Sequence, residues 1–315
     1  MPPFRKLKHV AGSPSAYVER YLWPLPRFRR EVVVMVDGVH SHGGLTDRLR
    51  NILSVYSYCK SRNISFRVYY VYPVRLEEIL VPASYDWRIG RKEISYHVLD
   101  SAEISLYVSG VPEEDDRRHI AALDGMLGTG RRIQLREYGN AYFAKGQYRA
   151  LFGELFRPSG YLKDRIDRLI AAMPEPYESV TLRFQALLGD FFEGPCKALG
   201  AEEGRELAQR CIEKIDGLRS QGYFSTEKVL VTSDSPTFIG LASTRPYIYT
   251  IPGRMEHMDF TDNHALDVGA KPFVDLFLLM RSERLTQLVT GRMYRSGFPA
   301  FAAELGGKAY NEILF

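Results

Sequence analysis

Apolar and polar residues alternate along this chain in blocks that predict strands followed by helices. The first block, Val32–Val36, is a short continuous apolar run, which is typical of a strand covered on both faces. From Leu45 to Lys60 the apolar positions recur at helical spacing, so this segment predicts an amphipathic helix. Ser65–Tyr72 is the next strand-like run. These segments predict a β-α-β unit near the N-terminus.

The middle of the chain has a less regular pattern. Strand-like runs cover Ile94–Leu99 and Ile104–Val111, and Pro112–Arg118 is a charged turn or helix start. The spacing of aromatic residues between Leu135 and Pro158 suggests helices. A further helix is expected over Tyr161–Met173, ending before a proline.

The second half repeats the strand and helix alternation more clearly. The expected strands are Ser179–Phe184, Lys228–Thr232, Tyr247–Ile251 and Thr286–Thr290. The expected helices are Glu202–Gln221, Pro236–Ala242, Pro272–Arg284 and Pro299–Leu305. Strands that alternate with helices favour a parallel, doubly wound sheet.

Pro174 and Pro176 mark the expected domain junction. They divide the chain into an N-terminal domain, residues 1–174, and a C-terminal domain, residues 175–315, consistent with about 150 residues per domain. We therefore expect an α/β protein with two Rossmann-like, doubly wound domains that face a cleft. Ligands of such sheets bind at the carboxyl ends of the strands, so the cleft is the expected site for a nucleotide and a second substrate.

Composition is that of a globular protein, with 45% hydrophobic and 25% charged residues. The net charge of +4 comes from scattered basic residues, which permits an anionic ligand and gives no reason to expect a nucleic acid. The N-terminus is locally basic, which is compatible with peripheral contact to an anionic membrane or with a solvated segment. Its basic residues are Arg5, Lys6, Lys8, Arg27, Arg29 and Arg30.

No apolar run approaches the ~20 residues that span a bilayer, and the N-terminus lacks the apolar core of a secretory signal. The expected location is the cytoplasm, and the alternative is a cytoplasmic protein in peripheral contact with the inner face of the membrane. Cys59, Cys196 and Cys211 have no metal-ligand spacing, so reduced thiols are expected. A mixed group of His257, Asp259, Asp262 and His264 matches no compact motif, and no metal site is expected.

Five short motifs in a fixed order resemble a known family. They are His42–Arg50 (HGGLTDRLR), Leu182–Phe184, Thr232–Ser235, Asp275–Leu279 and Ser296–Phe298. Their order is similar to that of the fucosyltransferase superfamily, which includes the rhizobial nodulation, core α-1,6- and protein O-fucosyltransferases. The resemblance implies a GT-B fold and an inverting transfer of fucose from GDP-fucose without a metal. The absence of any Asp-x-Asp pair in the sequence agrees with a metal-independent reaction.

The resemblance implies roles for several C-terminal residues. Arg183 would bind the β-phosphate, since a guanidinium can donate to two phosphate oxygens, although an ordinary strand-end salt bridge is the alternative. Asp234 would accept hydrogen bonds from guanine, with a plain N-cap role as the alternative, and Ser233 and Ser235 would cap the next helix or touch phosphate. Asp275 would brace the donor pocket or make a structural hydrogen bond. Relatives often have histidine where this chain has Thr181.

A late turn and an early loop complete the candidate site. Ser296, Gly297 and Phe298 resemble the turn that approaches the donor phosphates in relatives, where glycine permits close backbone contact. In the loop before the first helix, Gly43 and Gly44 would approach the donor, and free helix N–H groups favour an anion there. Arg48, or Arg50, would bind donor phosphate or an acidic acceptor.

An inverting transfer also needs a base for the acceptor hydroxyl. Asp47 is the first candidate, although an aspartate at a helix start is commonly only a partner of the helix dipole. His42 is the competing candidate, since its ordinary pKa of about 6.5 suits proton transfer.

The sequence thus predicts a fucosyltransferase that acts on a glycan hydroxyl in bacterial surface polysaccharide synthesis. The expected partners are the donor GDP-fucose and a glycan acceptor, with no cofactor. The alternatives are a related transferase that uses another nucleotide sugar and a catalytically silent glycan-binding protein on the same fold. The sequence does not indicate the acceptor, the linkage or the oligomeric state.

Overall fold

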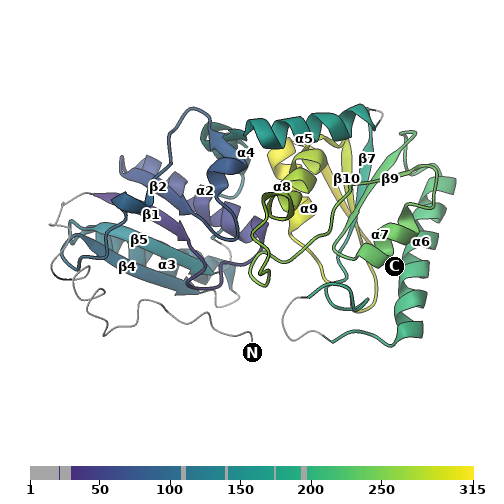
Figure 1. The fold of residues 1–315 in the computed structure, drawn as a ribbon, viewed down its shortest axis with the longest axis horizontal. Coiled ribbons are helices and arrows are strands. Elements are labelled where there is room, and N and C mark those ends of the chain that lie inside the picture. The colour runs from purple at the N-terminus through teal and green to yellow at the C-terminus, as the bar shows by residue number, and fades with distance from the viewer. Residues whose placement is uncertain (1–20, 22–29, 108–110, 139–140, 174, 193–196) are drawn as a thin grey trace. The chain divides into compact units, whose positions relative to one another are not determined.

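The protein is described from a computed structural model that covers residues 21, 30–107, 111–138, 141–173, 175–192 and 197–315. The chain forms two compact units, one ending at Arg157 and one beginning at Pro158. Each unit is built around a parallel β-sheet (Figure 1). The basic N-terminal residues lie outside the described residues, apart from Arg30, and Cys196 also lies outside them.

The first unit contains a parallel sheet with the strand order β2-β1-β5-β4. Its strands are β1 (Glu31–Val36), β2 (Ser65–Tyr70), β4 (Ser101–Tyr107) and β5 (Arg132–Tyr138). Its helices are α2 (Leu45–Ser61), α3 (Pro112–Leu127) and α4 (Tyr148–Leu155), with short 3-10 turns η2 (Leu76–Glu78) and η3 (Arg91–Glu93). A separate short pair joins β3 (Leu80–Pro82) to β6 (Phe156–Pro158).

The first β-α-β unit matches its sequence pattern. Every residue of β1 is buried, because this strand lies between β2 and β5 in the sheet. On α2, Leu49, Ile52 and Leu53 are fully buried, as the helical spacing of apolar residues predicts. The loop between β1 and α2 therefore starts and ends on well-packed elements.

The second unit contains a parallel sheet with the strand order β11-β10-β7-β8-β9. Its strands are β7 (Glu178–Leu182), β8 (Val229–Ser233), β9 (Ile248–Thr250), β10 (Arg284–Val289) and β11 (Ala309–Leu314). Its helices are α5 (Gly160–Ala171), α6 (Ala201–Ser220), α7 (Pro236–Ala242), α8 (Leu266–Arg281) and α9 (Phe298–Gly306). Figure 1 shows α6 and α7 on one side of this sheet and α8 and α9 on the other.

Some sequence expectations need correction. Ile94–Leu99 is not a strand: the described backbone there is irregular, and the strand begins at Ser101. The region expected to be helical from Leu135 starts inside β5, whose charged residues conceal its strand character. The last strand, β11, was not expected, because it is an edge strand with a largely exposed pattern.

Proline positions suggested two boundaries that differ from those of the structure. Helix α8 begins at Leu266, with Pro272 inside it, whereas the pattern suggested a start at the proline. The two compact units divide before α5, whereas Pro174 and Pro176 suggested a later junction. Helix α5 contacts α8, and this packing joins it to the second unit.

Candidate functional site

The second sheet has a topological switch point between β7 and β10. From β7 the chain continues through α6 to β8, whereas from β10 it continues through α9 to β11 on the opposite side. Such divergence leaves a crevice at the carboxyl ends of the two strands, where ligands of open α/β sheets bind. Arg183 follows β7 directly, and its carbonyl accepts a hydrogen bond of 3.2 Å from the Tyr294 N–H, which lies beyond β10.

Arg183 places a positive charge at this switch point. Its Nε lies 3.3 Å from Asp234 Oδ2, and its guanidinium carbon lies 4.6 Å from the centre of the Phe191 ring. The side chain remains 19% exposed. A guanidinium that is oriented from one side and still reaches solvent is suited to bind an anion such as a phosphate.

Asp234 organises the turn that carries Arg183. Its Oδ1 accepts a hydrogen bond of 2.9 Å from the Phe184 N–H, and its Oδ2 accepts one of 2.6 Å from the Gln185 N–H. Burial raises the pKa of Asp234, while the Arg183 charge and the two N–H groups act in the opposite direction. The structure thus gives Asp234 an internal role, and the expected contact to guanine stays a prediction.

The two serines beside Asp234 have different structural partners. Ser233 Oγ donates to Asp234 Oδ1 over 3.3 Å. Ser235 Oγ caps α7 by accepting from the Phe238 N–H at 3.1 Å, as the alternative interpretation of this motif expected. Thr181 is buried, and its hydroxyl lies 2.9 Å from that of Thr232.

Ser296, Gly297 and Phe298 begin α9 at the switch-point edge. Gly297 is the N-cap, and Ser296 Oγ accepts a hydrogen bond of 3.2 Å from the Phe298 N–H. Gln287 of β10 is buried, and its side-chain amide pairs with the Ser296 backbone. The amide oxygen accepts from the Ser296 N–H at 2.7 Å, and the amide nitrogen donates to the Ser296 carbonyl at 3.1 Å. This strand therefore fixes the start of α9, which presents the positive end of a helix dipole near Arg183's strand.

Asp275 does not reach a ligand-accessible surface. It is 1% exposed, and its Oδ1 accepts a hydrogen bond of 2.5 Å from buried Lys271 Nζ on the same helix. Burial raises the pKa of Asp275, and Lys271 opposes that shift. This ion pair within α8 is a structural interaction, which the sequence analysis left open as the alternative, and the bracing of a donor pocket stays a prediction.

The first unit carries its own polar cluster at the carboxyl edge of β1. Asp37 follows β1, and Arg136 of β5 binds both of its oxygens, with Nη2 2.6 Å from Oδ2. Burial alone would raise the pKa of Asp37, but its hydrogen bonds with His42 and Arg136 and the Arg136 charge hold that pKa well below the usual range. The sequence analysis missed this pair. The signal was a charged residue directly after a buried strand, paired with an arginine in a strand mistaken for a helix.

His42 and Asp47, the two candidate bases, both hold the loop between β1 and α2. His42 is 1% exposed, and its Nε2 accepts a hydrogen bond of 3.3 Å from the Gly38 N–H. Asp47 Oδ2 accepts one of 3.1 Å from the Gly44 N–H, as in a capping box. Gly43 has a φ of 75°, and an added Cβ would lie 2.6 Å from Asp47 Oδ2, so the glycine is required there.

Arg48 is a buried structural residue of the same loop. It is 1% exposed, and its Nε donates to the Gly43 carbonyl at 3.0 Å. Its Nη1 donates to the Tyr72 carbonyl at 2.7 Å and to Tyr70 Oη at 3.0 Å. This geometry connects the loop to the end of β2, and it leaves the expected phosphate contact of Arg48 without structural support.

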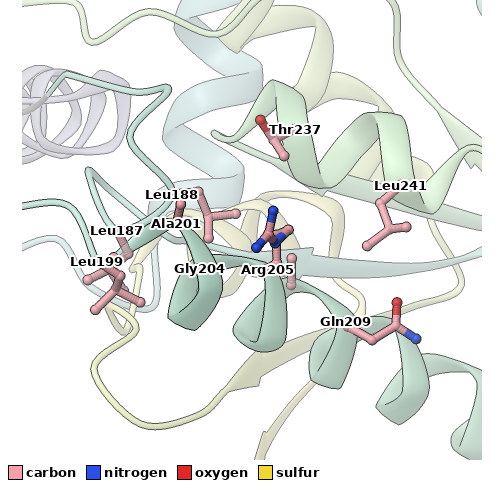
Figure 2. A pocket seen from close by; sticks show the side chains of 11 residues that line it. Leu187, Leu188, Leu199, Ala201, Gly204, Arg205, Gln209, Thr237 and Leu241 are labelled. Atoms are coloured by element: carbon pink, nitrogen blue, oxygen red, sulfur yellow. The ribbon is translucent and has the colours of Figure 1, made fainter.

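A cavity of about 530 Å³ lies between α6 and α7 in the second unit. Leucines from the segment after β7 form one end, and Figure 2 shows Arg205 projecting from α6 toward the space below Thr237 of α7. Its remaining wall is largely apolar. None of the residues expected to bind the donor lines this cavity.

The described residues contain neither a cluster of metal ligands nor a helix that could span a membrane. No group of three or more histidine, cysteine, aspartate or glutamate side chains is arranged to hold a metal ion within the described ranges. In the same part of the chain, no helix combines the length and apolar character needed to cross a membrane.

No protein-family model matches the sequence, and no curated protein sequence matches it. Its structure, however, is similar to solved structures of fucosyltransferases. Fucosyltransferase NodZ from Bradyrhizobium is 14% identical, with a TM-score of 0.53 over 87% of this chain and 92% of NodZ. An Arg-to-Lys mutant of Arabidopsis thaliana FUT1 in complex with GDP is 13% identical, with a TM-score of 0.54 over 95% of this chain and 74% of that one.

A third similar structure is POFUT1 in complex with GDP-fucose. It is 12% identical, with a TM-score of 0.51 over 92% of this chain and 99% of POFUT1. The likeness extends over both compact units in all three cases, since it covers nearly the whole chain. The chain therefore has the α/β, GT-B-type fold of the fucosyltransferases.

Proposed function

We propose that this protein is a glycosyltransferase that moves fucose from GDP-fucose to a hydroxyl group of a glycan. The observation that carries this proposal is the position of Arg183, a partly exposed guanidinium at the switch point of a sheet whose fold is that of fucosyltransferases. Structures of this fold include NodZ soaked with GDP-fucose and POFUT1 in complex with GDP-fucose. A nucleoside diphosphate needs positive charge when it departs, and Arg183 can supply it.

The reaction proposed here is inverting and needs no metal ion. Arg183 and the N–H groups at the start of α9 stabilise the negative charge that develops on the departing diphosphate. Asp234 keeps Arg183 oriented through the 3.3 Å contact to Nε, so part of the guanidinium remains available to the phosphate oxygens. The cellular role that we propose is bacterial surface polysaccharide synthesis in the cytoplasm, with peripheral contact to the inner membrane face.

A second candidate is a related transferase that uses a different nucleotide sugar. The observation that favours it is Thr181, whose hydroxyl pairs with Thr232 where relatives often carry a histidine that helps to hold the nucleotide. A silent glycan-binding protein on the same fold is the third alternative.

Nucleotide titrations distinguish these alternatives. We expect calorimetry to give micromolar binding of GDP and at least tenfold weaker binding of UDP and CMP. Binding of UDP or CMP in preference to GDP would favour the second candidate. Release of GDP from GDP-fucose over hours separates an enzyme from a silent binding protein, since the latter leaves the donor intact.

A further inference from the structure

The buried face of α6 carries large apolar side chains in the middle of the helix and small ones near its start. Ile212 and Ile215 are fully buried in the core of the second unit. Toward the N-terminus the same face continues through Ala208, Gly204 and Ala201, because residues three or four positions apart share a helix face. These small residues leave open the space that larger side chains would fill between α6 and α7.

This space is the cavity of about 530 Å³ in the second unit. Its volume falls within the range of roughly 300–1,000 Å³ that is usual for small-molecule sites. Figure 2 shows Leu187, Leu188 and Leu199 at one end of the cavity and Leu241 at the other. A molecule that fills this cavity therefore needs an apolar body, since only apolar groups gain by contact with such walls.

A permanent positive charge faces the same cavity. Arg205 projects from α6 toward the space below Thr237 of α7 (Figure 2). Within the described part of the chain, neither the Arg205 guanidinium nor the Thr237 hydroxyl makes a hydrogen bond or an ion pair. A guanidinium stays charged at any physiological pH and offers several N–H donors to a carboxylate or phosphate. The cavity thus presents unused donors beside an apolar wall.

The acidic residues closest in sequence do not offset this charge from within the cavity. The Asp190 carboxylate is used elsewhere, because its Oδ2 accepts from the Thr237 N–H at 2.8 Å and from the Ser235 hydroxyl at 2.7 Å. Arg205 is the one charged residue among the described residues that line the cavity. The residues outside the lining include Asp190 and the glutamates of the same helix turns, Glu202, Glu203 and Glu206.

We propose that this cavity binds an amphipathic anion, a molecule with an apolar body and one carboxylate or phosphate group. The apolar body packs against the leucines, and the anionic group accepts hydrogen bonds from the Arg205 guanidinium and the Thr237 hydroxyl. The site is separate from the crevice proposed for the donor, because none of the residues expected to bind the donor lines the cavity. It therefore stands whether or not the proposed function is correct.

The test begins with three decyl compounds that differ only in their polar group. Decanoate, decyl phosphate and decylammonium are titrated into the wild-type protein by calorimetry. We expect at least one of the two anions to bind, and the tighter of them identifies the anionic group that the cavity takes. Decylammonium should bind at least tenfold more weakly, because Arg205 repels its charge. Equal binding of decylammonium, or no binding of either anion, would overturn the inference.

A cavity-filling variant shows whether the bound anion occupies this space. A Cβ added at Gly204 would lie 3.6 Å from Leu188 Cδ2, an ordinary contact, so Gly204→Leu fills the cavity without displacing the backbone. We expect this variant to bind the preferred anion at least tenfold more weakly. The control is Gly217→Leu on the same helix, where an added Cβ meets no atom within 4 Å. Its affinity should stay within twofold of that of the wild-type protein.

The charge is tested at an exposed position, where a substitution does not disturb the core. Arg205→Gln should weaken binding of the anion at least tenfold, and Arg205→Lys should weaken it less, since lysine keeps the charge. Saturating GDP should leave the affinity for the anion within threefold. Full competition by GDP would place the anion in the crevice at Arg183 and overturn the inference. Unchanged binding in both Gly204→Leu and Arg205→Gln would overturn it as well.

Discussion

Arg136 and Asp37 form a two-pronged ion pair across adjacent strands of the first sheet. Arg136 Nε lies 3.2 Å from Oδ1 and 3.0 Å from Oδ2 of Asp37, and Nη2 lies 2.6 Å from Oδ2. Both side chains are less than a tenth exposed, at 4% and 7%. The pair fixes the start of the loop between β1 and α2, so its strength can be measured without any substrate.

Substitution of Asp37 should show how much this pair stabilises the fold. Asp37→Asn leaves the buried Arg136 guanidinium with Glu103 as its remaining acidic partner among the described residues, and we expect a loss of about 3 kcal/mol in the free energy of unfolding at pH 7. The matched control is Asp86→Asn, which breaks the exposed pair with Arg88 and should cost about 0.5 kcal/mol or less. Urea denaturation measures both, and equal losses would contradict a buried role for Asp37.

The same pair gives a pH dependence of known sign. Because the folded-state pKa of Asp37 is depressed, its contribution is complete above the unfolded-state pKa of 3.8 and is lost as the pH falls below that value. The difference in stability between wild type and Asp37→Asn should therefore shrink between pH 5 and pH 2.

Buried Glu137 should make the free energy of unfolding depend on pH in the opposite direction. Burial, assisted by Asp116, raises its pKa to about 8, and both of its oxygens lack a hydrogen-bond partner. Nearby His119 Nδ1 lies 3.8 Å from Oε1, and burial lowers the pKa of His119, so this imidazole does not supply a compensating charge.

The sign follows from proton binding. Between pH 4.5 and about 8 the folded protein keeps a proton on Glu137 that the unfolded chain has lost, so stability falls as the pH rises. Glu137→Gln should remove this slope and exceed the wild-type stability at pH 8 by about 1 kcal/mol or more. Urea denaturation of both proteins from pH 5 to pH 9 measures this difference in stability. A control, Glu283→Gln at an exposed position, should run parallel to wild type, and a parallel curve for Glu137→Gln would refute the assignment.

Arg48 should tolerate lysine poorly, because an ammonium group cannot reach the Gly43 and Tyr72 carbonyls at the same time. We expect Arg48→Lys to lower the free energy of unfolding by about 2–4 kcal/mol. Its neighbour Arg50, which packs on the Tyr142 ring at 5.2 Å, provides the control, and Arg50→Lys should cost less than about 1 kcal/mol. Thermal unfolding of the two variants side by side gives the comparison.

The alternation of strands and helices could be predicted because the spacing of apolar residues differs between a strand and a helix. Strand β1 and helix α2 follow that spacing, as do β7, β8 and α6 in the second unit. Strand β5 could not be predicted in this way, because Arg132, Arg136 and Glu137 are buried there. Their burial depends on partners such as Glu31 and Asp37, which are distant in sequence.

The residue types of the candidate site could be predicted from the sequence, but the roles of several of these residues could not. Arg183 comes at a strand end as expected, since the strand pattern before it fixes its position. Asp47 and Arg48 bind backbone groups of their own loop, and Asp234, which follows β8, binds backbone N–H groups of the turn after β7. Side-chain direction decides these contacts, and sequence spacing does not show it.

Calorimetric titration of GDP into wild-type protein and Arg183→Ala, both in buffer with EDTA, tests the central claim most directly. If a guanidinium takes the place of a metal ion, the wild-type protein should bind GDP fully in the presence of the chelator. Arg183→Ala should then lose GDP affinity at least 100-fold, about 2.7 kcal/mol, with a smaller loss in Arg183→Lys. Loss of wild-type binding in EDTA that manganese restores, or unchanged binding by Arg183→Ala, would contradict the account.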